Sequence, residues 1–218
     1  MIQTQLSPHM VLPDFFIQAL LSTPRQKFIP PLYRGHYTAD RNFPLEQHAN
    51  KRFLLTPLTL TRLLFPLFSF KDQSKKILLL AGGSGYSAAL IHQLGFTIFF
   101  VENQDSLLTL AQQNLAAFDN ISFYKKEDLK EGLPEEGPFD CILVDGGALC
   151  EIPPLYVQQL SKEGFILALL KGSSLSQDKV PLCQGIKQNI QGDKEILFDA
   201  FAPVNLDLSL SPTFSLDA

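Results

Sequence analysis

Residues 77 to 86 read Ile77-Leu-Leu-Leu-Ala-Gly-Gly-Ser-Gly-Tyr86, an apolar run that leads into a turn with three glycines. The apolar run predicts a strand over 77–80 that is buried on both faces, as in a parallel sheet covered by helices. We expect an amphipathic helix to follow as far as Leu94 and to end at Gly95. Glycines between a strand and a helix let a ligand approach the backbone closely, although tight packing alone also selects such a turn.

Strands and helices continue to alternate after this turn. We expect strands over 97–101, 121–124, 139–144 and 164–170, and helices that begin at Asp105 and span 153–160. Two further strands, over 180–190 and 195–203, are expected to form a closing antiparallel hairpin around Gly192-Asp193. The predicted fold is therefore α/β, with a mostly parallel sheet, an antiparallel closing hairpin and helices on its faces.

The first 73 residues show a different pattern. A helix is expected over 14–21, a second helix start at Thr23-Pro24 with Thr23 as the cap, and a long ordered loop over 32–55. Thr56-Pro57 begins another helix with one apolar face, formed by Leu60, Leu63, Leu64, Leu67 and Phe68. We predict a single domain over 1–218, in which a helical and loop segment (1–73) precedes the Rossmann-like core (74–218).

Composition excludes several classes of protein. The 218 residues are 45% hydrophobic and 18% charged, which is enough apolar surface for one good core. The longest apolar runs are far shorter than the roughly 20 residues that cross a bilayer. The N-terminus shows no signal peptide, so we expect a cytoplasmic protein. The three cysteines lack CxxC spacing and the four histidines are scattered, which indicates free thiols and no metal site.

Charge is distributed unevenly along the chain. Residues 1–76 hold 10 Lys and Arg against 4 Asp and Glu, whereas the remainder holds 8 against 18. A basic segment can bind nucleic acid, but no Lys/Arg run here exceeds two residues and the whole chain carries a net charge of −4. We therefore expect the two parts to complement each other and expect no nucleic-acid partner.

Acidic residues follow three of the expected strands. Glu102 comes after the strand over 97–101, Asp128 after the third strand and Asp145 after the fourth. A carboxylate after the second strand of such a unit can accept hydrogen bonds from both hydroxyls of a ribose, and one after the third can accept from an adenine amino group. Each acid alone could equally be a solvated strand end or turn residue. Together with the glycine turn they predict a nucleoside pocket at the carboxyl ends of the strands.

The glycine spacing argues against a dinucleotide. G-x-G-x-x-G is not met, because Ala88 stands where the third glycine should be. An NAD-binding oxidoreductase is therefore the less favoured interpretation.

Motifs spread over residues 12 to 204 resemble the protein-L-isoaspartate O-methyltransferases in order and in sequence. The opening Leu20-Leu-Ser-Thr-Pro-Arg-Gln-Lys-Phe-Ile-Pro30 is similar to the family's "AL…VPREXFVP". The others are Tyr37-Thr-Ala-Asp40, Phe43-Pro44-Leu45, Gly83-Ser-Gly-Tyr-Ser-Ala-Ala-Leu90, Val101-Glu102, Gly137-Pro-Phe-Asp-Cys-Ile-Leu-Val144, Ile152-Pro-Pro-Leu155 and the stretch from Phe198 to Val204.

The resemblance implies a Rossmann-like fold and S-adenosylmethionine as the methyl donor. It implies transfer of the methyl group to an isoaspartyl carboxylate in damaged proteins or peptides, in the cytoplasm, with no membrane or nucleic-acid partner. It places donor binding at Gly83, Ser84, Gly85, Tyr86, Glu102, Asp128, Leu129 and Asp145.

Several family positions differ in this chain. Where the family reads "GQTISXP" around the reacting groups, residues 51–57 place Phe53 and Leu55 at the two hydroxyl positions. Leu58 replaces a histidine found in many members. In the glycine turn, Leu79 stands at an acidic position and Ala81 at the first glycine. The polar substitutes left as weak catalytic candidates are Thr56 and Arg52, with Lys51 beside them; we expect Lys51 and Arg52 to lie in a solvated loop.

Three functions remain open from the sequence. The first is a protein carboxyl methyltransferase with reduced or altered specificity, and the second is a methyltransferase for another anionic acceptor steered by Lys51 and Arg52. The third is a catalytically silent binding or regulatory protein that keeps the fold. Glu102 and Asp128 favour the first two, whereas Leu79 and Phe53 favour the third. The oligomeric state is not encoded in any recognisable pattern.

Overall fold

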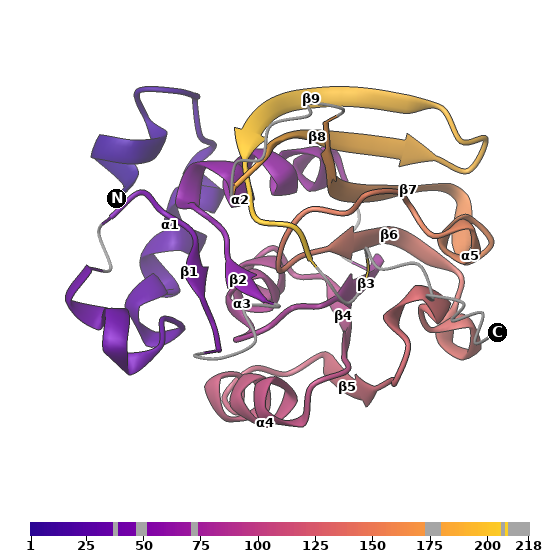
Figure 1. The fold of residues 1–218 in the computed structure, drawn as a ribbon, viewed down its shortest axis with the longest axis horizontal. Coiled ribbons are helices and arrows are strands. Elements are labelled where there is room, and N and C mark those ends of the chain that lie inside the picture. The colour runs from indigo at the N-terminus through magenta and orange to yellow at the C-terminus, as the bar shows by residue number, and fades with distance from the viewer. Residues whose placement is uncertain (37–38, 47–51, 71–73, 173–179, 206–207, 209–218) are drawn as a thin grey trace, which may run out of the picture.

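Seven strands form one sheet in the computed structural model, which describes residues 1–36, 39–46, 52–70, 74–172, 180–205 and 208 (Figure 1). The spatial order of the strands is β5-β4-β3-β6-β7-β8-β9. Their bounds are Lys76–Leu80 (β3), Thr97–Glu102 (β4), Ile121–Lys125 (β5), Phe139–Val144 (β6), Leu160–Lys171 (β7), Leu182–Asn189 (β8) and Lys194–Phe201 (β9).

The strand pairings confirm the predicted topology. β3 pairs in parallel with β4 on one side and β6 on the other, so that Leu79 lies between Phe100 and Leu143. β5 and β7 extend the parallel part, and β8 and β9 add the antiparallel closing hairpin. Because β3 is central, its carboxyl end is flanked by the ends of β4 and β6, and this arrangement positions the site described below.

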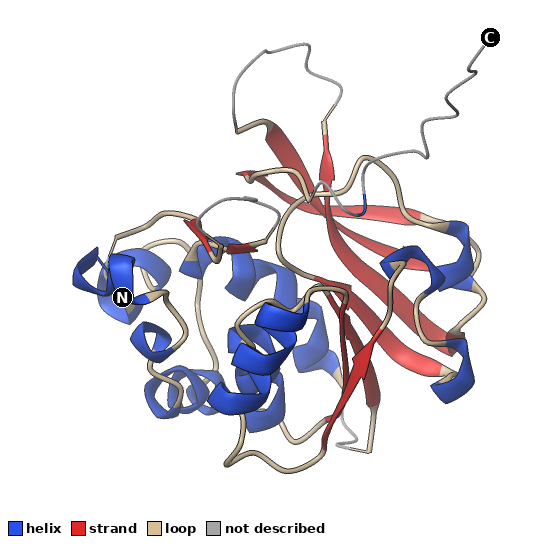
Figure 2. Ribbon diagram, turned by 60° about the horizontal axis from the view of Figure 1, so that its bottom comes forward, coloured by secondary structure: helices blue, strands red, loops and turns tan. Residues whose placement is uncertain are grey.

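Helices cover both faces of the sheet (Figure 2), and alternate residues of β3 belong to two separate hydrophobic cores. Ile77 and Leu79 pack into the larger core, with helices α1 (Asp14–Ser22), α2 (Pro57–Leu64), α3 (Tyr86–Gln93) and α4 (Asp105–Asn114). Leu78 and Leu80 pack into the smaller core, with the 3-10 turn η5 (Leu129–Glu131) and helix α5 (Pro154–Val157). Burial on both faces explains the uninterrupted apolar run.

The N-terminal segment confirms two predicted helices. Helix α1 spans Asp14–Ser22, and α2 begins after Thr56, whose hydroxyl accepts a hydrogen bond from Thr59 N at 3.2 Å. The apolar face of α2 is buried as expected. The helix becomes a 3-10 turn (η4, Phe65–Ser69) because Pro66 has no N–H to donate to the preceding turn.

Three expectations about local structure are wrong. Thr23 caps no helix: Arg25–Lys27 is a single 3-10 turn (η2), and the Thr23 hydroxyl has no hydrogen-bond partner within the described ranges. Phe28 and Ile29 turn into the core directly after it, and Pro30-Pro31 prevents its extension.

The described residues of 32–55 do not form one loop; residues 37–38 and 47–51 lie outside the described part. This region contains a 3-10 turn (η3, Pro31–His36) and two short paired strands, β1 (Phe43–Pro44) and β2 (Phe53–Leu54). The expected helix over 153–160 is only the four residues of α5, since Leu160 already pairs with Phe139 as the first residue of β7. A short π-helical turn, η1 (Ile2–Leu6), opens the chain.

Within the described ranges, no helix is long and apolar enough to cross a membrane. The same residues contain no group of three His, Cys, Asp or Glu side chains that could hold a metal ion. Cys141, Cys150 and Cys183 are free cysteines, and burial raises the pKa of the Cys141 thiol well above its usual value.

Candidate functional site at the carboxyl ends of the central strands

The glycine turn connects the end of β3 to the start of α3. Gly83 has φ +56° and Gly85 φ +89°, in the left-handed region that glycine adopts without strain. A Cβ on Gly83 would overlap the Leu45 side chain, so the turn is packed against the segment around β1. Ala81, at the family's first glycine, also has a positive φ of 58°. The backbone of the turn therefore keeps a glycine-type conformation even where the residue is alanine.

Two of the three predicted acids lie beside this turn. Glu102, the last residue of β4, accepts a hydrogen bond from Gly83 N at 3.2 Å. Asp145 follows β6, and its N–H donates to Leu80 O at 3.0 Å, which fixes it next to the end of β3. The convergence of strand ends that the sequence predicted is thus confirmed for both residues.

The third predicted acid lies on the surface. Asp128 precedes η5, and its exposed carboxylate caps that turn by accepting from Lys130 N at 2.9 Å. The neighbouring Leu129 is buried, and its carbonyl accepts a hydrogen bond from the Tyr156 hydroxyl at 2.9 Å. The turn is therefore held rigidly against α5, with the Asp128 side chain at its outer end.

Asp145 is almost completely buried, and burial raises its pKa from the usual 3.8 to about 6. The Gly146 N–H donates to its carboxylate at 2.7 Å and opposes this shift. A carboxyl group that titrates near pH 6 can change its charge close to neutrality, which is typical of functional sites but also of buried structural acids.

Arg52 corrects our expectation of a solvated basic pair. Its side chain is fully buried and contacts Glu102 through two nitrogens: Nε lies 3.3 Å from Oε2 and Nη2 lies 3.0 Å from Oε1. Nη2 also donates to Asn103 Oδ1 at 2.7 Å, and Nη1 donates to Asn205 Oδ1 at 2.9 Å. Lys51 lies outside the described residues, as do Tyr37 and Thr38 of the motif that begins at Tyr37.

The expected S-adenosylmethionine does not fit this arrangement at its ribose. Glu102 is in the position from which a carboxylate would accept from a ribose diol, but its oxygens already accept from Arg52, Gly83 N and Asn103 N. An ionised carboxylate offers about four acceptor positions, and all four are used. The site accepts a ribose only if the Arg52 side chain takes another position.

The other replaced family positions are mainly core residues. Leu55 and Leu79 are buried in the larger core, and Phe53 is half-buried, with its N–H donating to Gly146 O at 3.0 Å. The hydroxyl of Thr56 serves the start of α2, bonded to the backbone and the hydroxyl of Thr59. Thr56 therefore has a structural role that its Thr-Pro context already predicted.

Sequence reasoning missed several residues of the site. Asn103 and Asn205 bind the Arg52 guanidinium, and no spacing or motif distinguishes either of them in advance. Arg25 is buried beside Tyr86, and burial lowers its pKa to about 10. Its Nη2 donates to Leu55 O at 2.8 Å, whereas its Nε and Nη1 and the Tyr86 hydroxyl have no hydrogen-bond partner among the residues that the structure describes.

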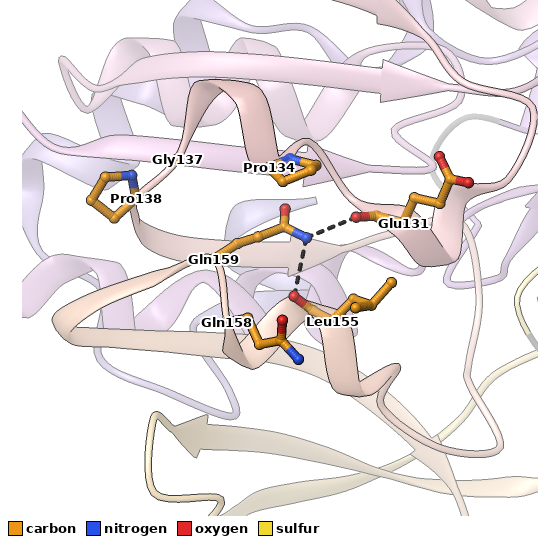
Figure 3. A pocket seen from close by; sticks show the side chains of 7 residues that line it. All are labelled: Glu131, Pro134, Gly137, Pro138, Leu155, Gln158 and Gln159. Carbon is orange, nitrogen blue, oxygen red and sulfur yellow. Dashed lines mark hydrogen bonds between the residues drawn. The ribbon is translucent and has the colours of Figure 1, made fainter.

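A separate hollow of about 530 Å³ lies at the opposite end of β6 (Figure 3). Gln159 lines this hollow. The amide nitrogen of Gln159 donates to the carbonyls of Glu131 (2.7 Å) and Leu155 (3.0 Å), and its amide oxygen accepts from Leu133 N. Since every polar group of Gln159 is used within the chain, this residue ties η5 to α5 rather than facing a ligand.

Comparison with known proteins gives a family match over most of the chain. The family model described as protein-L-isoaspartate(D-aspartate) O-methyltransferase matches residues 1–195. A relative of that name from Koribacter versatilis is 30% identical over 168 residues, which cover 75% of this chain and 72% of the relative. One from Chlorobium phaeobacteroides is 28% identical, with 86% and 83% covered.

Solved structures show the same fold. A protein-L-isoaspartate O-methyltransferase structure superposes with a TM-score of 0.69 at 20% identity, over 90% of this chain and 63% of that one. A second, described as a putative enzyme of this type from Plasmodium falciparum in complex with S-adenosyl-L-homocysteine, has a TM-score of 0.70 at 18% identity, with 93% and 95% covered. On its sequence match and its fold, this chain belongs to the protein-L-isoaspartate(D-aspartate) O-methyltransferase family, whose members are S-adenosylmethionine-dependent enzymes.

Proposed function

We propose that this chain is a methyltransferase for isoaspartyl carboxylates in damaged proteins or peptides. The observation that carries the proposal is the convergence of the glycine turn after β3, Glu102 after β4 and Asp145 after β6 at one edge of the sheet. Family membership supports the reaction class. A cytoplasmic location, which would keep the three cysteines reduced as free thiols, belongs to the same proposal.

The residues proposed to contact the donor share the edge formed by the strand ends and the turns that follow them. Gly83 and Gly85 would provide close backbone approach, Glu102 the ribose contact and Asp128 with Leu129 the adenine contact. Ser84 and Tyr86 are buried in the turn, their hydroxyls without a hydrogen-bond partner in the described part of the chain, and Asp145 completes the set. One domain over 1–218 is part of this proposal.

Methyl transfer is expected to be slow in this chain. Phe53 and Leu55 cannot donate hydrogen bonds to an acceptor carboxylate, and Leu79 offers no charge to a donor ammonium group. Losing two polar contacts of about 1–3 kcal/mol each would slow the reaction on the order of 10- to 10⁴-fold relative to a member that keeps them. Since the donor does not fit while Arg52 is in place, we assign no individual catalytic step to these residues.

A second candidate is a binding or regulatory protein without turnover. The closed network of Arg52, Glu102, Asn103 and Asn205 favours it, because this network occupies the ribose contacts of the site with side chains of the protein itself. The two candidates differ in one respect that can be measured, the transfer of a methyl group.

The test is transfer of a radiolabelled methyl group from S-adenosylmethionine to an isoaspartyl peptide, compared with the same peptide containing ordinary aspartate. We expect slow labelling of the isoaspartyl peptide alone, and its loss in Glu102→Gln. Glu163→Gln, which neutralises an exposed acid on β7, serves as the matched control and should keep the wild-type rate. No labelling by any form, with all of them folded, would refute the enzymatic proposal and support the second candidate.

A further inference from the structure

The Arg52 side chain crosses the edge of the sheet between two glycine turns. Its Cδ lies 2.8 Å from the point where a Cβ on Gly146 would be, and its Cβ lies 4.0 Å from the corresponding point on Gly83. Phe53 N, the next residue, is bonded to Gly146 O at 3.0 Å, so the backbone holds the start of this path in place. The stem therefore lies between the turns that follow β6 and β3, and its guanidinium reaches Glu102 at the end of β4.

The guanidinium takes the contacts that a ribose diol would need. Oε1 of Glu102 accepts from Arg52 Nη2 and Asn103 N, and Oε2 accepts from Arg52 Nε and Gly83 N. Two donors per oxygen fill the acceptor positions of a carboxylate. A ribose offers two hydroxyl donors to the same oxygens, so the diol and the guanidinium exclude each other.

Charge favours the guanidinium in this competition. Arg52 and Glu102 are both 0% exposed, and a buried carboxylate without a countercharge is strongly unfavourable. A diol supplies hydrogen bonds but no positive charge. Asn103 and Asn205 add two further hydrogen bonds that hold the guanidinium where it is.

We infer that Arg52 is an internal occupant of the ribose position and sets the affinity of this chain for adenosine-containing ligands. Such a ligand gains its ribose contacts with Glu102 only when the Arg52 guanidinium leaves. The inference rests on the proposed function for the identity of the pocket. Within that function, Arg52 is the residue that distinguishes this chain from a family member whose donor site is open.

The experiment compares adenosine with 2′,3′-dideoxyadenosine, because these nucleosides differ only in the hydroxyls for which Arg52 would compete. Affinities are measured by calorimetric titration of the whole chain in three forms: wild type, Arg52→Gln and the matched control Arg62→Gln. Arg62 carries the same charge on α2, over the Phe198 ring and away from Glu102. Thermal unfolding of each form verifies that it is folded.

We expect the wild type and Arg62→Gln to bind the two nucleosides within about twofold of each other. Arg52→Gln should bind adenosine about tenfold more tightly than the dideoxy form, the effect of regained hydrogen bonds to a charged group. If Arg52→Gln does not fold, Arg52→Lys replaces it. Because a lysine ammonium cannot contact both oxygens of Glu102 as the guanidinium does, part of the carboxylate becomes free, and we expect about threefold tighter binding of adenosine than of the dideoxy form.

Two results would overturn the inference: tenfold discrimination already in the wild type, or no gain of discrimination in the folded Arg52 variant, including the case in which it binds neither nucleoside. Failure of the proposed function has a different signature. Discrimination gained in Arg52→Gln without methyl transfer by any form would keep Arg52 as the occupant and remove the enzymatic role. Methyl transfer by the wild type without any gain of discrimination in Arg52→Gln would keep the enzymatic role and remove Arg52 as the occupant.

Discussion

The guanidinium of Arg52 and the carboxylate of Glu102 form a buried ion pair, with Nη2 3.0 Å from Oε1 and Nε 3.3 Å from Oε2. Arg52 belongs to the basic part of the chain and Glu102 to the acidic part, so this contact realises the charge complementarity that the sequence suggested. It also joins the residue that precedes β2 to the end of β4 at the centre of the candidate site. Its energetics therefore bear on both stability and ligand binding.

The ion pair predicts strong coupling between its two members. Arg52→Met or Glu102→Gln alone leaves a buried polar group without its countercharge and should lower the free energy of unfolding by about 3–5 kcal/mol. The double variant should lose much less than the sum of the two single losses. Urea unfolding measures all four forms. The exposed pair Lys125–Asp105 is the control cycle and should show no measurable coupling. Additive losses at Arg52 and Glu102 would contradict the prediction.

Asp145 predicts a pH-dependent stability. Its pKa is about 6 in the folded protein against 3.8 ordinarily, so between these values the folded state binds more protons than the unfolded state. The contribution of Asp145 to the free energy of unfolding is therefore fully present below about pH 4. It falls by about 3 kcal/mol in all as the pH rises through 6.

The measurement is the free energy of unfolding at pH 4 and pH 7 for three forms. Between these pH values the wild type should lose about 2 kcal/mol more than Asp145→Asn, which cannot ionise. Asp199→Asn, which removes an exposed carboxyl on β9, should follow the wild type. Parallel behaviour of the wild type and Asp145→Asn would show that the buried carboxyl does not titrate in this range.

We predict that restoring the family's acid at position 79 destabilises the folded protein. The Leu79 side chain is fully buried within the larger cluster of hydrophobic residues, on a strand position paired with Phe100 and Leu143. Leu79→Glu should therefore lower the free energy of unfolding by more than about 3 kcal/mol. Leu79→Met, which keeps the volume, should cost less than about 1.5 kcal/mol. Equal stability of the two variants, measured by urea unfolding, would mean that a carboxylate at this position finds a partner or water.

We predict that Ala81→Gly changes the free energy of unfolding very little. The φ of 58° at this position costs an alanine about 1 kcal/mol, which Ala81→Gly recovers, so that the loss of a buried methyl group is nearly balanced. Ala89 is equally buried but helical, and Ala89→Gly should cost about 1–2 kcal/mol more than Ala81→Gly. Thermal or urea unfolding of the two variants tests the difference. A loss at Ala81 as large as at Ala89 would contradict a strained backbone at the turn.

The ranges of the strands and the sheet edge that carries the candidate site could be predicted from the sequence, because both depend on local patterns. Apolar runs of the right length identified β3, β4 and β6, and the glycine turn marked the end at which a ligand would bind. Glu102 and Asp145 were found because a residue that directly follows a parallel strand lies at the sheet edge wherever the rest of the chain goes. The extent of α5 and the short strands β1 and β2 were not predicted. Pairing with β6 ends α5, and the hydrogen bond from Phe53 N to Gly146 O holds β2; such tertiary contacts leave no periodicity in the sequence.

The sequence by itself thus determined the α/β fold, the family and the acids at the strand ends. Only the tertiary structure decided what those acids bind. Arg52 follows no helical or strand repeat, and its partners Glu102 and Asn205 are 50 and 153 residues away in the chain. A side chain of this length can reach solvent or a buried carboxylate from the same backbone position. The choice depends on the two glycine turns, which leave room for its stem, and on the free energy gained when two buried charges meet.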